Sequence, residues 1–194
     1  RALFIVKAYE QKDATICYHK ELKRYYMKKF GIFYGSSTGV TAETADEIAK
    51  NLGTAPADVY NVRHTNPDKV SEYDNLILGS STWGAGDLQD DWYDFLDGLE
   101  VLDLQGKKIA LFGCGDETMS DTFCGAVGEL YNRLQKTGAT FIGAYPADCY
   151  NFSISPSFVN GQYVGLLLDN VNREELSADR IKGWCAQIKQ QTAR

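Results

Sequence analysis

Residues 30–41 read Phe30-Gly31-Ile32-Phe33-Tyr34-Gly35-Ser36-Ser37-Thr38-Gly39-Val40-Thr41, and this stretch decides the fold. An apolar, strand-like run ends abruptly at small and hydroxyl-bearing residues, and a helical pattern begins at residue 40. A tight loop between a strand and a helix lets backbone N–H groups converge at the positive end of the helix dipole, which makes an anion site. The loop has no Lys or Arg, whereas the phosphate loop of a nucleotide triphosphatase needs a Lys. We therefore expect a cofactor with one terminal phosphate, held by N–H groups and by the hydroxyls of Ser36, Ser37, Thr38 and Thr41.

The rest of the chain alternates between strand-like and helix-like segments. Apolar runs that are nearly continuous indicate strands buried on both faces, and they occupy residues 30–34, 58–62, 76–78, 109–112 and 141–145. Helical patterns lie at 40–52, 90–99, 122–137 and 177–190. The alternation predicts an α/β fold with a five-stranded parallel sheet, doubly wound in the flavodoxin-like order 2-1-3-4-5, in a three-layer sandwich. Ligands of such folds bind outside the carboxyl ends of the strands, at the switch point between strands 1 and 3.

Two regions break this alternation. Residues 146–162 are polar and contain Pro and Gly, and they precede a strand-like run at 163–168, so we predict an insertion that splits the last strand. Residues 1–26 precede Met27, and we interpret them as an N-terminal extension outside the fold core, with an extra edge strand as the alternative. Residues 27–194 are then expected to form a single domain.

Two more loops are predicted to lie at the same edge of the sheet as the first. Residues 79–87 place Trp83 among small residues, where its ring could stack on an aromatic ligand, and Gly84 and Gly86 would allow close backbone approach. The Gly-rich residues 112–121 could present backbone groups to the edge of a heterocycle. Each loop alone is weak evidence, and a lone Trp is more often a packing residue. After strands 1, 3 and 4 of one sheet, the three loops together predict one ligand site.

In these loops the sequence resembles the flavodoxin family, long-chain subclass. Gly35–Thr41 is similar to the family's phosphate loop for FMN, Ser81-Thr82-Trp83-Gly84 with Leu88–Trp92 to its first flavin loop, and Phe112–Asp116 with Phe123-Cys124 to its second. The resemblance runs from about residue 28 to 189 and includes the insertion and the last helix. It implies that FMN is bound by Ser36, Ser37, Thr38, Gly39, Val40, Thr41, Ser81, Thr82, Trp83, Gly84, Cys114, Gly115, Asp116, Met119 and Phe123.

The second flavin loop departs from the family pattern at one position. Family members usually place a Tyr there, stacked on the outer face of the flavin, whereas this chain has Met119, or Ser120 under another alignment. A thioether packed on a ring contributes about 0.3–1.5 kcal/mol, so the outer cover would be smaller and more flexible than Tyr.

The resemblance implies a low-potential, one-electron carrier that works between a reductase and acceptor redox enzymes. The loops hold no candidate base or nucleophile, and the two histidines, His19 and His64, are expected on the surface. The alternative is an FMN-dependent NAD(P)H quinone or azo reductase on the same fold, since one fold serves many functions. A phosphoacceptor receiver would need acidic residues after strand 1, where the chain has Gly35-Ser36-Ser37.

The distribution of charge limits the kinds of partner that the protein can bind, and the cysteine content indicates its cellular compartment. Ten Asp or Glu lie between residues 82 and 121 against two Lys, which excludes a nucleic-acid surface. We expect an acidic rim that meets basic faces of redox partners such as a flavodoxin reductase, although a solvated helix face is the plainer alternative. The rim comprises Asp87, Asp90, Asp91, Asp94, Glu117 and Asp121.

No apolar run reaches the ~20 residues of a membrane span. Five cysteines without metal-type spacing predict reduced thiols in a cytoplasmic protein, which we expect to be a monomer.

Overall fold

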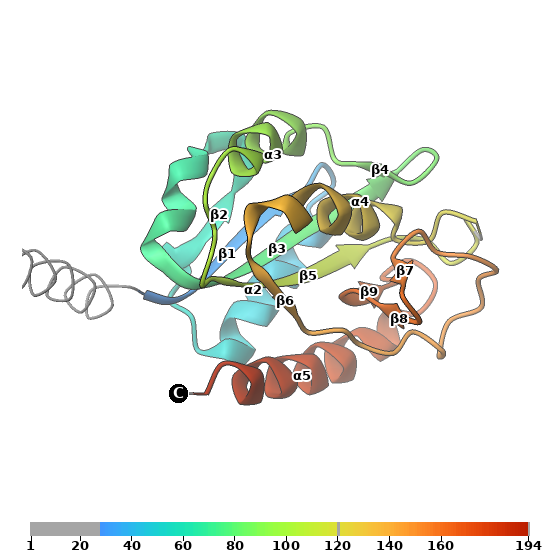
Figure 1. Ribbon diagram of the computed structural model, residues 1–194. Helices are drawn as coiled ribbons and strands as arrows, with labels where there is room; N and C mark the ends of the chain where they lie inside the picture. Colours follow the sequence, from blue (N-terminus) through green and yellow to red (C-terminus); the bar gives the residue numbers. More distant parts are fainter. Residues whose placement is uncertain (1–27, 120, 194) are drawn as a thin grey trace, which may run out of the picture.

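Most strands of the computed structural model, which describes residues 28–119 and 121–193, form a central sheet (Figure 1). The core strands are β1 (Lys28–Gly35), β2 (Val59–Asn61), β3 (Tyr73–Trp83), β5 (Lys108–Cys114) and β6 (Thr140–Ile142). Short strands are β4 (Asp87–Leu88), β7 (Phe158–Val159), β8 (Gln162–Tyr163) and β9 (Leu166–Leu168). The core strands pair in parallel in the order β2-β1-β3-β5-β6, which confirms the predicted topology. The predictions for residues 1–26 and for Ser120 lie outside the described residues.

Consecutive residues of the core strands are buried on both faces of the sheet. Neighbouring side chains in a strand point to opposite faces of the sheet. The exposure is nevertheless 0% for both members of two neighbouring pairs, Ile32 and Phe33 of β1 and Ile77 and Leu78 of β3. Such burial requires helices on both sides, as the continuous apolar runs predicted.

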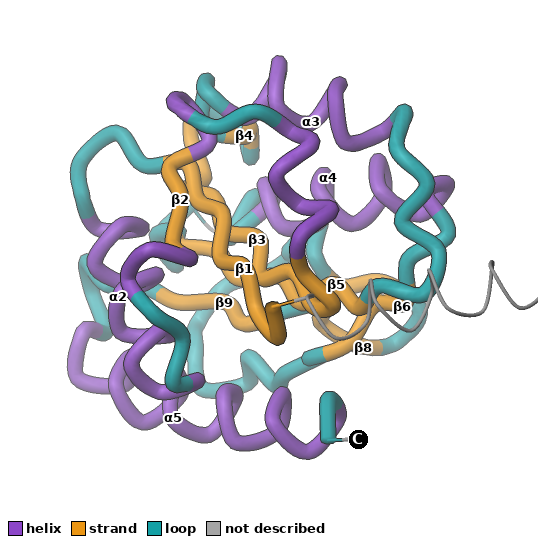
Figure 2. The backbone as a smooth tube through the Cα atoms, turned by 90° about the vertical axis from the view of Figure 1, so that its left-hand side faces the viewer, coloured by secondary structure: helices purple, strands orange, loops and turns teal. Residues whose placement is uncertain are grey.

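In the described part of the chain, four helices cover the sheet, two on each face (Figure 2). They are α2 (Val40–Leu52), α3 (Trp92–Glu100), α4 (Gly125–Leu134) and α5 (Glu174–Gln191). The short 3₁₀ turns are η1 (Pro56–Asp58), η2 (Val62–His64), η3 (Pro67–Glu72) and η4 (Gln135–Thr137). One hydrophobic core joins α3 and α4 to the sheet, and a second joins α2 and α5 to its other face, which gives the predicted three layers. None of the helices in the described part of the chain is long and apolar enough to cross a membrane.

The last strand position is shared by β6 and β9. Both pair in parallel with β5, β6 along its first half at Ile109↔Phe141 and β9 along its second half at Gly113↔Leu167. The chain between them folds as irregular loops and the β7–β8 ribbon, which confirms an insertion in the last strand. Strand β6 ends earlier than the predicted residue 145, because Gly143 adopts a φ of 78° and its N–H and C=O bond to Gln191 and Trp184 of α5.

Candidate cofactor site

The loop after β1 leaves backbone N–H groups without acceptors at the start of α2. Gly39 takes a φ of 99°, which favours glycine, and its N–H donates to Ser36 Oγ at 3.1 Å. The first helical hydrogen bond runs from the Glu43 N–H to the Gly39 carbonyl at 3.0 Å. The N–H groups at positions 40–42 therefore have no acceptor within the helix, as at any helix N-terminus. This arrangement, with no cationic side chain among residues 35–41, is suited to binding an anion through backbone N–H groups.

Two orphaned hydroxyls fit a ligand at the predicted loops. Within the described part of the chain, four buried side-chain nitrogen or oxygen atoms lack a hydrogen-bond partner, and they belong to Thr41, Thr54, Thr82 and Arg180. Thr41 stands in the first turn of α2 and Thr82 at the end of β3, both at positions predicted to contact FMN. A buried polar atom without a partner is uncommon and needs an explanation. A polar ligand bound at these two loops would supply the missing hydrogen-bond partners.

The second loop is the β3–β4 hairpin, which carries Trp83. The side chain of Trp83 is 46% exposed, and its Nε1–H donates to Ser81 Oγ at 3.0 Å, which fixes the indole at the loop surface. The turn closes with a hydrogen bond from the Gly86 N–H to the Trp83 carbonyl at 3.0 Å, and Gly84 and Gly86 have positive φ angles. An exposed aromatic face held by its own loop is available for stacking.

The third loop follows β5 and is closely hydrogen-bonded. The carboxylate of Asp116 accepts bonds from the Thr118 N–H at 2.8 Å, the Thr118 hydroxyl at 2.6 Å and the Asn172 amide at 2.8 Å. The hydroxyl bond of Thr118 is the main reason that the pKa of Asp116 is lowered. The Met119 side chain is 53% exposed, as an outer cover for a flavin would be before the flavin binds.

The three loops meet because they follow neighbouring parallel strands. In the sheet, Gly35 lies beside Ser80, and Ser81 lies beside Cys114. Gln89, 3% exposed, links two of the loops: its N–H donates to Ser80 Oγ at 3.2 Å and its side-chain amide to Ser37 Oγ at 3.3 Å. The sequence places Gln89 within the stretch that resembles the first flavin loop, but it does not predict that this side chain links two loops.

The side chains of two residues predicted to bind the cofactor are buried in the protein. The Cys114 side chain is 7% exposed, with its sulfur 3.5 Å from Thr44 Oγ1, and burial raises the pKa of its thiol. Phe123 is 1% exposed, and its ring stacks on Phe152 at 4.6 Å and meets Tyr150 edge-on at 5.2 Å. The structure therefore places the Phe123 ring in the core, whereas Trp83 and Met119 are both exposed.

One residue of the predicted acidic rim, Glu117, is held in an ion pair, whereas most of the others are exposed. Asp87, Asp90, Asp94 and Asp121 are exposed. Glu117 differs from the prediction, because its carboxylate lies 3.7 Å from Arg173 and accepts the Asn151 N–H at 2.7 Å. The adjacent acids of α3, Asp97 and Glu100, bind Arg133 of α4, and the Arg133 hydrogen bond lowers the pKa of Glu100 to about 2.

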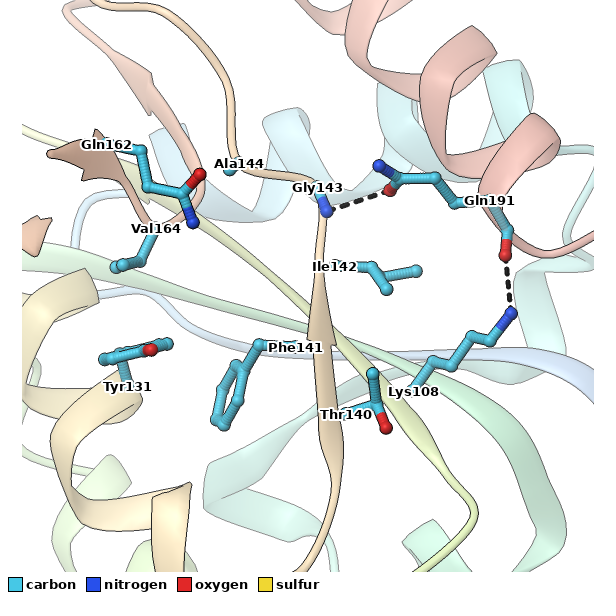
Figure 3. A pocket seen from close by; sticks show the side chains of 10 residues that line it. All are labelled: Lys108, Tyr131, Thr140, Phe141, Ile142, Gly143, Ala144, Gln162, Val164 and Gln191. Atoms are coloured by element: carbon cyan, nitrogen blue, oxygen red, sulfur yellow. Dashed lines mark hydrogen bonds between the residues drawn. The ribbon is translucent and has the colours of Figure 1, made fainter. Parts of the chain in front are cut away.

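A groove of about 510 Å³ lies along β6 and away from these loops (Figure 3). Tyr131, Phe141 and Val164 form its apolar side, and the Gln191 side chain bonds to the Gly143 N–H above Lys108. None of the residues predicted to bind the cofactor lines this groove.

Comparison with known proteins places the whole described fold in one family. The flavodoxin family model matches residues 32–184. Flavodoxin 1 of Azotobacter vinelandii is 39% identical over 170 residues, which cover 85% of this chain and 98% of that protein. Flavodoxin 1 of Escherichia coli K12 is 40% identical over 163 residues, covering 83% of this chain and 93% of that protein. The crystal structure of Fusobacterium nucleatum flavodoxin bound to flavin mononucleotide matches with a TM-score of 0.77 and 32% identity, covering 85% of this chain and 99% of that one. The chain belongs to the flavodoxin family, and the insertion between β6 and β9 is the one expected of its long-chain subclass.

Proposed function

We propose that this protein carries single electrons on non-covalently bound FMN, which it holds where the loops after β1, β3 and β5 meet. The proposal depends on three features that lie at one edge of the sheet: the N-terminus of α2, the exposed Trp83 and the hydrogen-bonded, Gly-rich loop after β5. Flavodoxins are electron carriers that exchange electrons with other redox proteins and do not transform a substrate themselves. FMN supplies the redox chemistry when bound, and the chain supplies its position and electrostatic surroundings.

Each loop is assigned one part of the cofactor. The N–H groups at the start of α2, with the hydroxyls of Ser36, Ser37, Thr38 and Thr41, would hold the phosphate. Trp83 would stack on one face of the ring and Met119 would cover the other. Backbone groups of residues 114–116 would meet the edge of the heterocycle, since the side chain of Cys114 is buried. Neutral donors suffice for a phosphate at a helix N-terminus.

The charges beside the site favour a low reduction potential and basic partners. Asp87, Asp90 and Asp94 have no ion pair among the described residues, and they stand close along the chain to the hairpin that carries Trp83. Reduced FMN carries added negative charge, so nearby carboxylates disfavour it and lower the potential. The same carboxylates would attract the basic face of a reductase or an acceptor enzyme. We further propose that residues 27–194 suffice as the FMN domain and that the protein works in the cytoplasm, which the four free cysteines of the described residues support.

Adding FMN to the purified cofactor-free protein tests the proposal. We expect tight uptake of FMN with quenched flavin fluorescence, and weaker binding of riboflavin, which lacks the phosphate. The loaded protein should not oxidise NAD(P)H unless a separate reductase is added. A protein that takes up no FMN would overturn the proposal, and unaided NAD(P)H oxidation would favour the reductase alternative.

A further inference from the structure

A fully buried carboxylate lies behind the third loop. Asp169 follows β9 directly and has 0% exposure. Its Oδ1 accepts the N–H groups of Val171 at 2.9 Å and Asn172 at 2.8 Å. Its Oδ2 accepts the Glu117 N–H at 2.9 Å and the Asn172 side-chain amide at 2.8 Å. Hydrogen bonds to an ionised acceptor are about twice as strong as those between neutral groups, so this carboxylate ties its partners firmly.

The hydrogen bonds of Asp169 are part of a tether between β9 and the third loop. Gly115 donates its N–H to the Leu168 carbonyl at 2.9 Å, Asp116 accepts the Asn172 amide at 2.8 Å, and Glu117 donates to Asp169. Three consecutive residues of the loop are thus attached to three residues at or just beyond the end of β9. A loop held at each residue has little freedom to change its backbone, so the position of a flavin edge against it is preset.

The negative charge of Asp169 also acts on two buried thiols at the ends of the third loop, Cys114 and Cys124. Its hydrogen-bond partners are backbone N–H groups and one amide, none of which carries a positive charge. Burial is the main cause of the raised pKa values of the Cys114 and Cys124 thiols, and the negative charge of Asp169 adds to both shifts. A buried charge is screened by salt much less than a surface charge.

We propose that Asp169 is a positioning residue for FMN, which presets the backbone of residues 115–117 and, by its buried charge, disfavours the reduced cofactor. This inference rests on the proposed FMN function. Sequence reasoning had assigned Asp169 no such role.

Two substitutions separate the tether from the charge. Asp169→Asn removes the charge and replaces one acceptor oxygen by a donor, so two hydrogen bonds are lost. Asn172→Ala removes the amide that joins Asp169 to Asp116 and leaves the charge of Asp169 in place. Asp179→Asn, an exposed site on α5, is the control for a loss of one negative charge.

We expect Asp169→Asn to raise the dissociation constant of FMN about tenfold. The Glu117 amide of the cofactor-free variant should exchange with solvent at least about tenfold faster, measured by hydrogen exchange. The reduction potential should rise by about 59 mV, if the ratio of affinities for reduced and oxidised FMN changes tenfold. Asn172→Ala should weaken FMN binding with a smaller change in potential, and Asp179→Asn should match the parent protein in all three measurements.

The outcomes distinguish this inference from the function on which it rests. If the parent protein binds FMN and Asp169→Asn matches it in affinity, potential and Glu117 exchange, the positioning role is wrong. If Asp169→Asn does not fold, Asn172→Ala decides, and parent-like FMN affinity with parent-like Glu117 protection would overturn the proposal. A parent protein that fails to bind FMN would overturn the proposed function, whereas Glu117 exchange in the cofactor-free protein still tests the tether.

Discussion

Replacing Thr41 by Val should move the stability of the cofactor-free protein and its affinity for FMN in opposite directions. Thr41 is 1% exposed, and its hydroxyl lies near the Cys114 thiol, a weak hydrogen-bonding group, but has no hydrogen-bond partner of normal geometry. A buried hydroxyl without a partner costs about 1–3 kcal/mol, and Val has nearly the same shape, so Thr41→Val should stabilise the cofactor-free protein by about 1 kcal/mol. A hydrogen bond to a charged phosphate contributes about 1.5–3 kcal/mol, so the same change should weaken FMN binding about 10- to 150-fold.

Thr54→Val is the matched control, because Thr54 also carries an orphaned buried hydroxyl but follows the opposite end of α2. Urea unfolding of the cofactor-free variants measures the first effect, and titration of flavin fluorescence with FMN and with riboflavin measures the second. Both variants should be stabilised, but only Thr41→Val should lose FMN affinity, and neither should change riboflavin binding.

Two results would refute this reasoning. If Thr41→Val is stabilised and binds FMN as the parent does, the hydroxyl is an orphan without a ligand role. If the cofactor-free variant is instead destabilised, the hydroxyl has a partner in solution, and the phosphate assignment loses its support.

Four further predictions concern other parts of the molecule. Trp83→Ala should weaken FMN binding by about 1–3 kcal/mol, as loss of base stacking does, and an unchanged fluorescence titration would exclude stacking. A chain that begins at Met27 should bind FMN and melt as the full chain does, whereas a lower melting temperature would show that residues 1–26 pack on the domain. Burial raises the pKa of Glu129 above 4.5, so the stability of the protein falls as pH rises through that raised value. Glu129→Gln removes the buried carboxylate and should therefore raise the melting temperature at pH 7 but not at pH 4. Equal gains at both pH values would contradict the burial effect. Ser157→Ala removes the hydroxyl that donates to the buried Cys124 carbonyl at 2.7 Å, and urea unfolding should show a loss of about 1–3 kcal/mol, with no loss if water replaces the hydroxyl.

The order of the sheet could be predicted from the sequence because its signals are local. The helix predicted at 40–52 is found at those bounds, since a loop of small residues starts it and Gly53 ends it with a φ of 75°. The last helix starts three residues before the predicted residue 177, at Glu174. That start is acidic and has no side-chain cap, so the sequence offers little to mark it.

Residues whose surroundings come from distant segments could not be placed in this way. Phe123 in a Gly-rich loop has the same local pattern whether it faces a ligand or the core, and the core is supplied by Tyr150 and Phe152 of the insertion. Glu117 is likewise acidic and next to the site in sequence, but Arg173, 56 positions further along, removes it from the rim. In both cases the contact that determines the residue's surroundings is made with the segment between β6 and α5. No short sequence pattern predicts where that segment lies in the fold.

The ion pairs between α3 and α4 bear on how one acidic segment could serve two purposes. Asp97 and Glu100 bind Arg133 and so join the two helices, whereas Asp87, Asp90 and Asp94 are exposed and have no ion pair among the described residues. Exposed charges are screened within about 10 Å at 0.1 M salt, so an attraction of these three acids for a basic partner should weaken as salt is added. Asp169 is fully buried, and its effect on the cofactor should persist under the same conditions. Recognition of a partner and control of the potential therefore need not depend on the same carboxylates, because one group lies in water and the other behind the third loop.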